Sequence, residues 1–203
     1  MQIESISEYK KKRYKVLLDN GTVWNLYAAD LRTCQLKQGM YLSDELFDRI
    51  EIEVLEKRAV KRAMHLLEKK DWTEKKLRDK LMESEYPEKA IDAAIAYVTG
   101  YHYLDDLRYA QNFVRAYQDT RSRKRITMDL LAKGVAKSWI EQAFADTYEA
   151  DEQQMIRRLL EKKNYHFGIA DDSERRKVYA FLLRRGFRSE DVLRAMKCSD
   201  YLT

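Results

Sequence analysis

Apolar and polar residues alternate near the N-terminus in a way that predicts β-strands. Tyr14, Val16 and Leu18 stand at alternate positions, and a second run of β-prone residues spans 23–27. Asn20-Gly21 separates the two runs, and this pair favours the left-handed backbone of a tight hairpin turn. A third extended run, over 3–8, could pair at the edge of the hairpin. The sequence therefore predicts a short β-rich segment at the start of the chain.

Two helical stretches are expected next. The first covers 29–36, and the second covers 44–56 after a turn at Gly39. Ser43 stands immediately before the second stretch, where a serine side chain can accept a hydrogen bond from an unpaired backbone N–H.

From about residue 51 onward apolar residues recur at helical spacing, and this pattern occurs three times. When the copies are aligned at Glu85, Gly134 and Gly186, apolar residues stand eight and four positions before, and six and ten positions after, these residues. Such offsets define one helix face on each side of a turn. Glycine favours the positive φ of a helix C-terminus, whereas the first copy has Glu85 there, followed by Pro87 at the start of the next helix. The sequence predicts a repeated helical hairpin.

Each copy has one more helix before the hairpin, which predicts a mainly α fold of three tandem three-helix repeats behind a short β-hairpin segment. We expect Thr73 and Ser122 to cap middle helices and 164–173 to form an exposed loop. A unit this small buries little apolar surface, so an elongated, curved array of stacked copies is expected. The expected boundaries are 1–50 for the N-terminal extension, then 51–100, 101–150 and 151–203 for the three repeats.

The composition supports this interpretation. Hydrophobic residues make up 45% of the 203 residues, which is enough for a packed core, and charged residues make up 36%. Six glycines and one proline are few, as expected for helices joined by short loops. The net charge of +5 is too small to decide for nucleic-acid binding by itself, so the placement of the charges matters more.

The sequence contains no pattern typical of a catalytic or cofactor site. The glycines form neither of the phosphate-binding motifs GxGxxG and GxxxxGK followed by Ser or Thr, and the histidines lie too far apart for the usual metal-ligand spacings. Asp105-Asp106 favours the start of a helix over an acidic metal pair. We therefore expect no enzyme, no cofactor and no metal.

The remaining global features predict a cytoplasmic protein. No apolar run approaches the roughly 20 residues of a membrane span, and the N-terminus lacks the apolar core of a signal peptide. Cys34 and Cys198 belong to no paired motif and are expected to be reduced thiols. We expect a soluble monomer with no membrane contact.

Basic residues cluster beside the middle helix of each copy. The clusters are Lys75, Lys76, Arg78 and Lys80; Arg121, Arg123, Lys124 and Arg125; and Arg175, Arg176, Lys177, Arg184, Arg185 and Arg188. Repeat symmetry would place them along one side of the array, which suits a polyanion or a repeating partner surface. Guanidinium groups additionally suit bidentate contacts with carboxylates or phosphates. The residues expected to make these contacts are Arg121, Arg123, Lys124, Arg125, Arg184, Arg185, Lys76 and Lys80.

The N-terminal basic run from Lys10 to Arg13 leaves two interpretations open. It either extends the binding surface or makes the end of the hairpin more soluble.

Three segments together resemble a known family. They are GYHYLDDLRYAQNFV at 100–114, LLAKGV at 130–135 and FLLRRGF at 181–187. In this order and spacing they resemble the bacterial RecX regulatory proteins, over about residues 55–200. The N-terminal KRYKVLLDNG is similar to an extension that many members carry. This chain departs from the family pattern at Tyr101–Tyr103, which widen the stretch between the glycine and the two aspartates, and at 121–125.

The resemblance implies a partner and an activity. RecX proteins bind the RecA recombinase, usually as a filament on single-stranded DNA, where they lodge in the groove and block extension or promote disassembly. Strand exchange, ATP hydrolysis and stimulation of the SOS coprotease then fall, which modulates homologous recombination and DNA repair. Direct contact with DNA is compatible with this activity.

The residues themselves leave two other functions open. One is a basic helical-repeat module that binds DNA or RNA without contacting RecA. The other is a helical scaffold whose basic clusters bind nothing.

Overall fold

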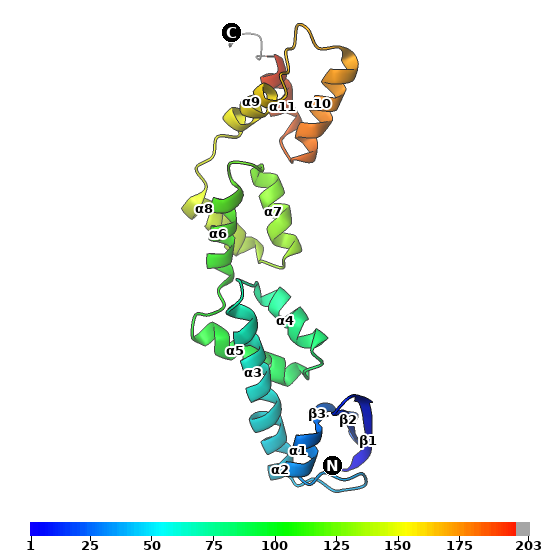
Figure 1. Cartoon of the computed structure of the whole chain (residues 1–203). Coiled ribbons are helices and arrows are strands. Elements are labelled where there is room, and N and C mark those ends of the chain that lie inside the picture. The colour runs from blue at the N-terminus through cyan, green and yellow to red at the C-terminus, as the bar shows by residue number, and fades with distance from the viewer. Residues whose placement is uncertain (198–203) are drawn as a thin grey trace. The chain divides into compact units, whose positions relative to one another are not determined.

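The computed structural model describes residues 1–197, and Cys198 lies outside the described residues. The chain divides into two compact units, the first from Met1 to Asp105 and the second from Asp106 onward. Figure 1 shows the course of the chain through both units, and helices predominate in each, as predicted. Within residues 1–197, no helix combines the length and the apolar character that a membrane span requires.

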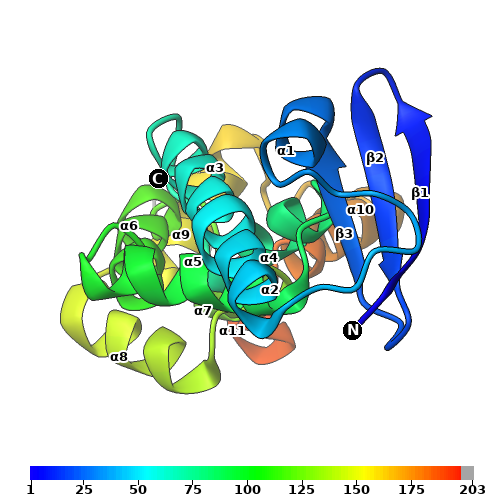
Figure 2. The ribbon, with the colours of Figure 1, turned by 90° about the horizontal axis from the view of Figure 1, so that it is seen from below.

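The first unit begins with a three-stranded antiparallel sheet. Its strands are β1 (Ile3–Lys10), β2 (Arg13–Leu18) and β3 (Val23–Tyr27), with β2 in the middle. Figure 2 shows the three strands side by side. Gly21 has a φ of +81° in the turn between β2 and β3. The predicted hairpin is confirmed, and the extended run at 3–8 belongs to the edge strand β1.

The helix predicted over 44–56 is longer than expected and continues to Leu67. After the short α1 (Ala28–Thr33), α2 (Asp44–Arg49), the π-helical segment η1 (Ile50–Glu56) and α3 (Lys57–Leu67) follow one another without interruption. Ser43 caps the start, since its Oγ accepts from the Leu46 N–H at 3.2 Å. The core-facing residues of the continuous helix are Ile50, Leu55, Ala59, Ala63 and Leu66. The step of five residues from Ile50 to Leu55 fits the wider turn of a π-helix, which keeps both side chains on the core side.

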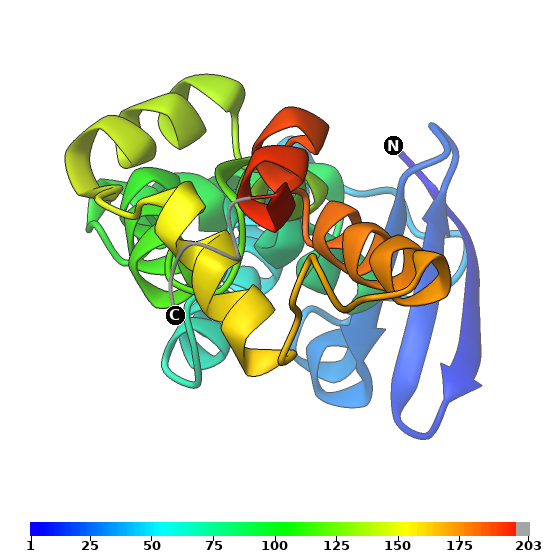
Figure 3. The ribbon, with the colours of Figure 1, turned by 90° about the horizontal axis from the view of Figure 1, so that it is seen from above.

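The three repeats have the predicted helical hairpins. The first repeat consists of α3, α4 (Glu74–Glu83) and α5 (Glu88–Gly100). The second consists of α6 (Asp106–Tyr117), α7 (Arg123–Ala132) and α8 (Lys137–Thr147). The third consists of α9 (Glu152–Lys162), α10 (Asp172–Arg184) and α11 (Ser189–Lys197). Figure 3 shows the third repeat with α9 in yellow, α10 in orange and α11 in red.

The positive φ predicted for Gly134 and Gly186 is confirmed, and Glu85 has the same backbone conformation although it is not a glycine. Glu85, Gly134 and Gly186 have φ values of +65°, +87° and +88°. Thr73 and Ser122 cap α4 and α7, because each side-chain oxygen accepts a hydrogen bond from the backbone N–H three residues later. The aligned apolar residues are buried in all three copies: Leu77, Leu81, Ile91 and Ile95; Ile126, Leu130, Ile140 and Phe144; Val178, Leu182, Val192 and Met196.

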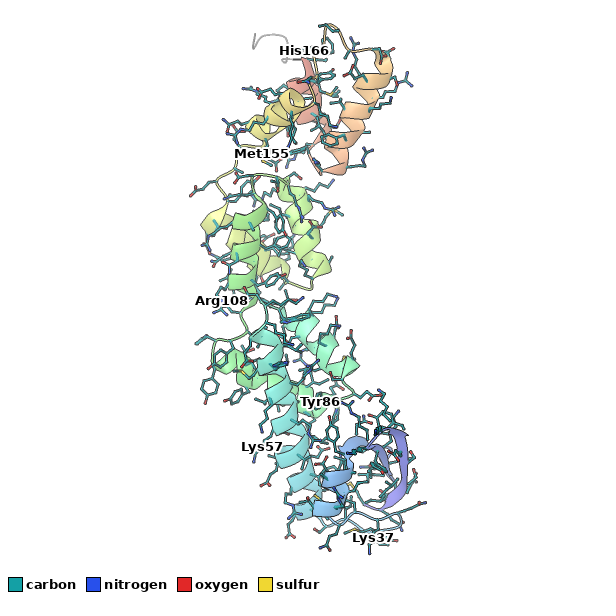
Figure 4. All side chains as sticks on the ribbon, in the orientation of Figure 1. Lys37, Lys57, Tyr86, Arg108, Met155 and His166 are labelled. Atoms are coloured by element: carbon teal, nitrogen blue, oxygen red, sulfur yellow. The ribbon has the colours of Figure 1, made fainter. Side chains whose placement is uncertain are left out.

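The loop between α9 and α10 is less exposed than predicted. His166, labelled in Figure 4, is exposed, but Tyr165 and Ala170 are buried and Phe167 is half-buried. These three side chains pack against the core of the third repeat. The loop thus covers an apolar surface that α9 and α10 leave open, and the prediction of an exposed loop over 164–173 was wrong for these positions.

Candidate partner-binding surface

Most of the basic residues on α4 are neutralised within the first unit. Lys76 pairs with Asp79 at 3.4 Å, and Lys80 pairs with Glu83. Arg78 lies between Glu74 and Asp92, and these hydrogen-bonded carboxylates raise its pKa. Both predicted contact residues of this cluster therefore already have an acidic neighbour.

In the second unit, Asp129 binds two of the predicted arginines. Arg121 Nη1 lies 2.8 Å from Asp129 Oδ2, and Arg125 Nε lies 3.2 Å from Asp129 Oδ1. The guanidinium group of Arg121 also stacks over the Tyr117 ring, 3.8 Å from its centre. The sequence has no acid between Asp119 and Asp129, yet the i,i+4 spacing of a helix brings Asp129 to Arg125. Arg121 and Arg125 consequently stabilise the start of α7.

Arg123 connects the second repeat to the third. Its guanidinium group lies over the Phe144 ring at 4.6 Å, and its backbone N–H donates to the Glu152 carboxylate at 2.6 Å. The Tyr148 hydroxyl also contacts Glu152, at 3.3 Å. Burial, and to a smaller extent the charge of Glu152, raises the pKa of Tyr148 well above its ordinary value, so the phenol keeps its proton.

Ser122 joins the start of α7 to the end of α10. Its fully buried Oγ accepts from the Arg125 N–H at 3.1 Å and donates to the Arg185 carbonyl at 3.0 Å. Gly186 lies directly against this serine. The contact brings the second and third basic clusters together.

A hollow of about 520 Å³ lies beside this junction. Three cations from the two clusters line it, together with the acids Glu152 and Asp191. The cations are Arg123, Lys124 and Arg188.

Two of the predicted residues are free to contact a partner. Lys124 and Arg184 are exposed, and neither side chain has a hydrogen bond or ion pair within residues 1–197. Arg185 differs, because its guanidinium group packs over the Phe181 ring at 4.2 Å and its Nε is buried without a partner. The structure thus brings Arg121, Arg123, Lys124, Arg125, Arg184 and Arg185 to adjoining helix ends of the second unit, and places Lys76 and Lys80 on α4 of the first. A single row of cations across all three repeats stays a prediction.

Two residues of the N-terminal basic run make contacts within the first unit. Lys10 pairs with Glu85 at 3.4 Å, and Arg13 stacks over Tyr27. The Tyr9 hydroxyl also donates to Glu85, at 2.6 Å, and this hydrogen bond is the main cause of the lowered pKa of Glu85. Lys10 and Arg13 therefore help to connect the sheet with the rest of the first unit, which neither sequence interpretation included.

Comparison with known proteins identifies the family. Models of the first, second and third RecX three-helix domains match residues 59–97, 105–143 and 150–196. A protein of Caldanaerobacter subterraneus named "Regulatory protein RecX" is 30% identical over 194 residues, covering 94% of this chain and 95% of its own length. The chain belongs to the RecX family.

Other RecX proteins agree with this assignment. One from Vibrio campbellii is 34% identical over 139 residues, covering 68% of this chain and 89% of its own length. A crystal structure of regulatory protein RecX matches 97% of this chain and 98% of its own, with a TM-score of 0.64 at 24% identity. RecX from Lactobacillus salivarius matches 72% of this chain and 97% of its own, with a TM-score of 0.62 at 22% identity. Both solved structures share the fold.

Family membership confirms two expectations from the sequence. The resemblance based on the three motifs was correct, and RecX proteins are regulators rather than enzymes, as expected for this chain. The assignment of individual contact residues on the basic helices remains a prediction.

Proposed function

We propose that this protein binds RecA and its filament on single-stranded DNA and lowers the ATPase, strand-exchange and SOS coprotease activities of RecA. Membership in the RecX family of regulatory proteins supports RecA as the regulated protein. The contact would lie at the junction of α7 and α10, and the protein would act as a cytoplasmic monomer, modulating DNA repair and homologous recombination.

The observation that carries this proposal is the pair of unpartnered cations at the junction. Lys124 and Arg184 can bind a carboxylate or phosphate of a partner without breaking an interaction of their own. Arg121 and Arg125 would first have to leave Asp129, so their contribution is to position α7. Lys76 and Lys80 on α4 would exchange their neighbouring acids for those of the partner.

The test is a titration of the protein into RecA that hydrolyses ATP on single-stranded DNA. We expect half-maximal inhibition at a concentration of the protein well below that of RecA, because one molecule bound to a filament affects many RecA subunits. Unchanged ATP hydrolysis at an equimolar ratio would contradict the proposal.

Direct binding to nucleic acid is the second candidate, because free cations bind phosphate as well as carboxylate. In this case the protein would withdraw DNA from RecA, and extra single-stranded DNA would restore the ATPase. The affinity for DNA alone would also fall steeply with salt. Inhibition that persists in excess DNA supports contact with RecA.

A further inference from the structure

The middle helix of every repeat presents the same two exposed side chains. Counted from Glu85, Gly134 and Gly186, a cation stands ten positions earlier and a large apolar residue three positions earlier. We call each such pair a cation–apolar couple. The couples are Lys75 with Met82 on α4, Lys124 with Leu131 on α7, and Arg176 with Leu183 on α10, and Figure 1 shows the three helices.

The two members of a couple lie on the same face of their helix. Seven residues correspond to two helical turns, so the side chains are separated by about 10 Å along the helix axis with little rotation around it. The core residues of α7, Ile126 and Leu130, lie about 100–160° around that helix from the couple, because each residue advances by about 100°. The same geometry applies to α4 and α10, so each couple faces away from the core of its own repeat.

Both members of each couple are accessible to a partner. Met82, Leu131 and Leu183 are 63%, 46% and 36% exposed. The three cations are exposed, and their side chains have no hydrogen bond or ion pair within the part of the chain that is described. A single exposed apolar residue is ordinary on a protein surface. Recurrence of the same couple at the same position in three helices needs another reason.

We propose that each couple recognises one acidic group beside an apolar depression on a repeating protein partner. This inference rests on the proposed function, which identifies that partner as the RecA filament. The cation would pair with a carboxylate, and the apolar side chain would be buried in the adjoining depression, as in the apolar centre of a protein interface. A DNA backbone could satisfy Lys75, Lys124 and Arg176 but offers phosphate and sugar rather than a pocket for Met82, Leu131 and Leu183.

The cation of each couple differs from the cation that follows it in the first two copies. Lys76 and Arg125, one position later in their copies, bind Asp79 and Asp129 within their own helices. The cations ten residues before the turn, Lys75, Lys124 and Arg176, form no ion pair within residues 1–197. Three repeats therefore offer three equivalent contacts to a partner whose own subunits repeat, and such contacts reinforce one another when they are made together.

The inference is tested with the variant Met82→Gln, Leu131→Gln, Leu183→Gln. Glutamine favours the helix and removes the apolar contact without a change in charge. Affinity for preformed RecA filaments and for single-stranded DNA alone is measured by fluorescence anisotropy of the labelled protein. We expect filament affinity to fall roughly ten- to a hundredfold, because truncation of buried interface residues commonly costs this much. The affinity for DNA alone should change less than about twofold by the same argument.

The matched control carries glutamine at three other exposed apolar residues, Trp139, Ile169 and Leu193. It should bind filaments as the wild type does, and both variants should keep the wild-type melting temperature within about 2 °C, as exposed substitutions do. Undiminished filament binding by the Met82, Leu131 and Leu183 variant, or an equal loss in the control, would overturn the inference while leaving the proposed function intact. A wild-type protein that binds no RecA filament would overturn both.

Discussion

The variant Gly186→Ala is expected to destabilise the second unit by about 2–4 kcal/mol. Gly186 has a φ of +88°, which costs about 1 kcal/mol for a residue with a Cβ. That Cβ would also lie 2.5 Å from Ser122 Oγ and 3.1 Å from the Arg125 nitrogen. Ser122 cannot move away without losing its hydrogen bonds to Arg125 and Arg185, so overpacking adds about 1–3 kcal/mol.

Urea unfolding combined with hydrogen exchange of peptides from α7 and α10 measures this effect where it arises. Substitutions at two other glycines separate the cost of backbone strain from the cost of overpacking. Gly39 has a φ of +80° but open space around it, so Gly39→Ala should cost only the backbone strain, about 1 kcal/mol. Gly100 lies at the end of α5 without positive φ or near neighbours, so Gly100→Ala should be neutral or slightly stabilising. Equal losses for Gly186→Ala and Gly39→Ala would show that the contact with Ser122 has no energetic importance.

The double charge reversal Lys124→Glu, Arg184→Glu is expected to raise the concentration required for half-maximal inhibition of RecA by at least about tenfold. Each substitution replaces an attraction to an acidic partner with a repulsion of like charges. The structural cost should be small, since Lys124 lies in the first turn of α7 and Arg184 in the last turn of α10. A glutamate is favourable at a helix N-terminus and unfavourable at a C-terminus, so the two changes largely offset one another.

The control for this variant is Arg157→Glu, Arg158→Glu on α9. These arginines are also exposed, lack a partner within residues 1–197, and give the same change in net charge. The control should inhibit RecA nearly as the wild type does, measured by the same ATPase titration at constant ionic strength. Comparable losses in both variants would show that the overall charge, and not the α7–α10 junction, determines inhibition.

The fold was largely predictable because it follows from local rules. Helical spacing of apolar residues identifies the core faces, and the capping residues Thr73 and Ser122 mark where the first two middle helices begin. The positive φ of Gly134 and Gly186 follows from the absence of a Cβ. Even Glu85 could be placed at this turn, because the repeat aligns it with the two glycines although its side chain alone gives no such signal.

The features that were missed depend on packing between distant residues. In the π-helical segment η1 both Ile50 and Leu55 face the core, and Tyr165 is buried against an apolar surface of the third repeat. The stacking of Arg123 on Phe144 likewise joins residues from two helices. The sequence shows none of these contacts.

Two features of the candidate surface were nevertheless present in the sequence. The pairing of Arg125 with Asp129 follows from i,i+4 spacing on a helix. The residues Met82, Leu131 and Leu183 stand in register once the three copies are aligned, but only their exposure in the structure distinguishes them from core positions. Positive charge alone does not distinguish free cations from arginines such as Arg121 and Arg125, which already bind Asp129.

We expect the middle-helix surface of α7 and α10 to contact RecA itself, and site-specific photocrosslinking tests this contact most directly. A photoreactive residue is placed at Lys124, at Arg184 or, as a control, at Arg158, and the protein is irradiated with RecA filaments on single-stranded DNA. We predict covalent adducts with RecA from the first two positions and few from Arg158. Adducts with DNA alone, or equal RecA adducts from all three positions, would contradict the account.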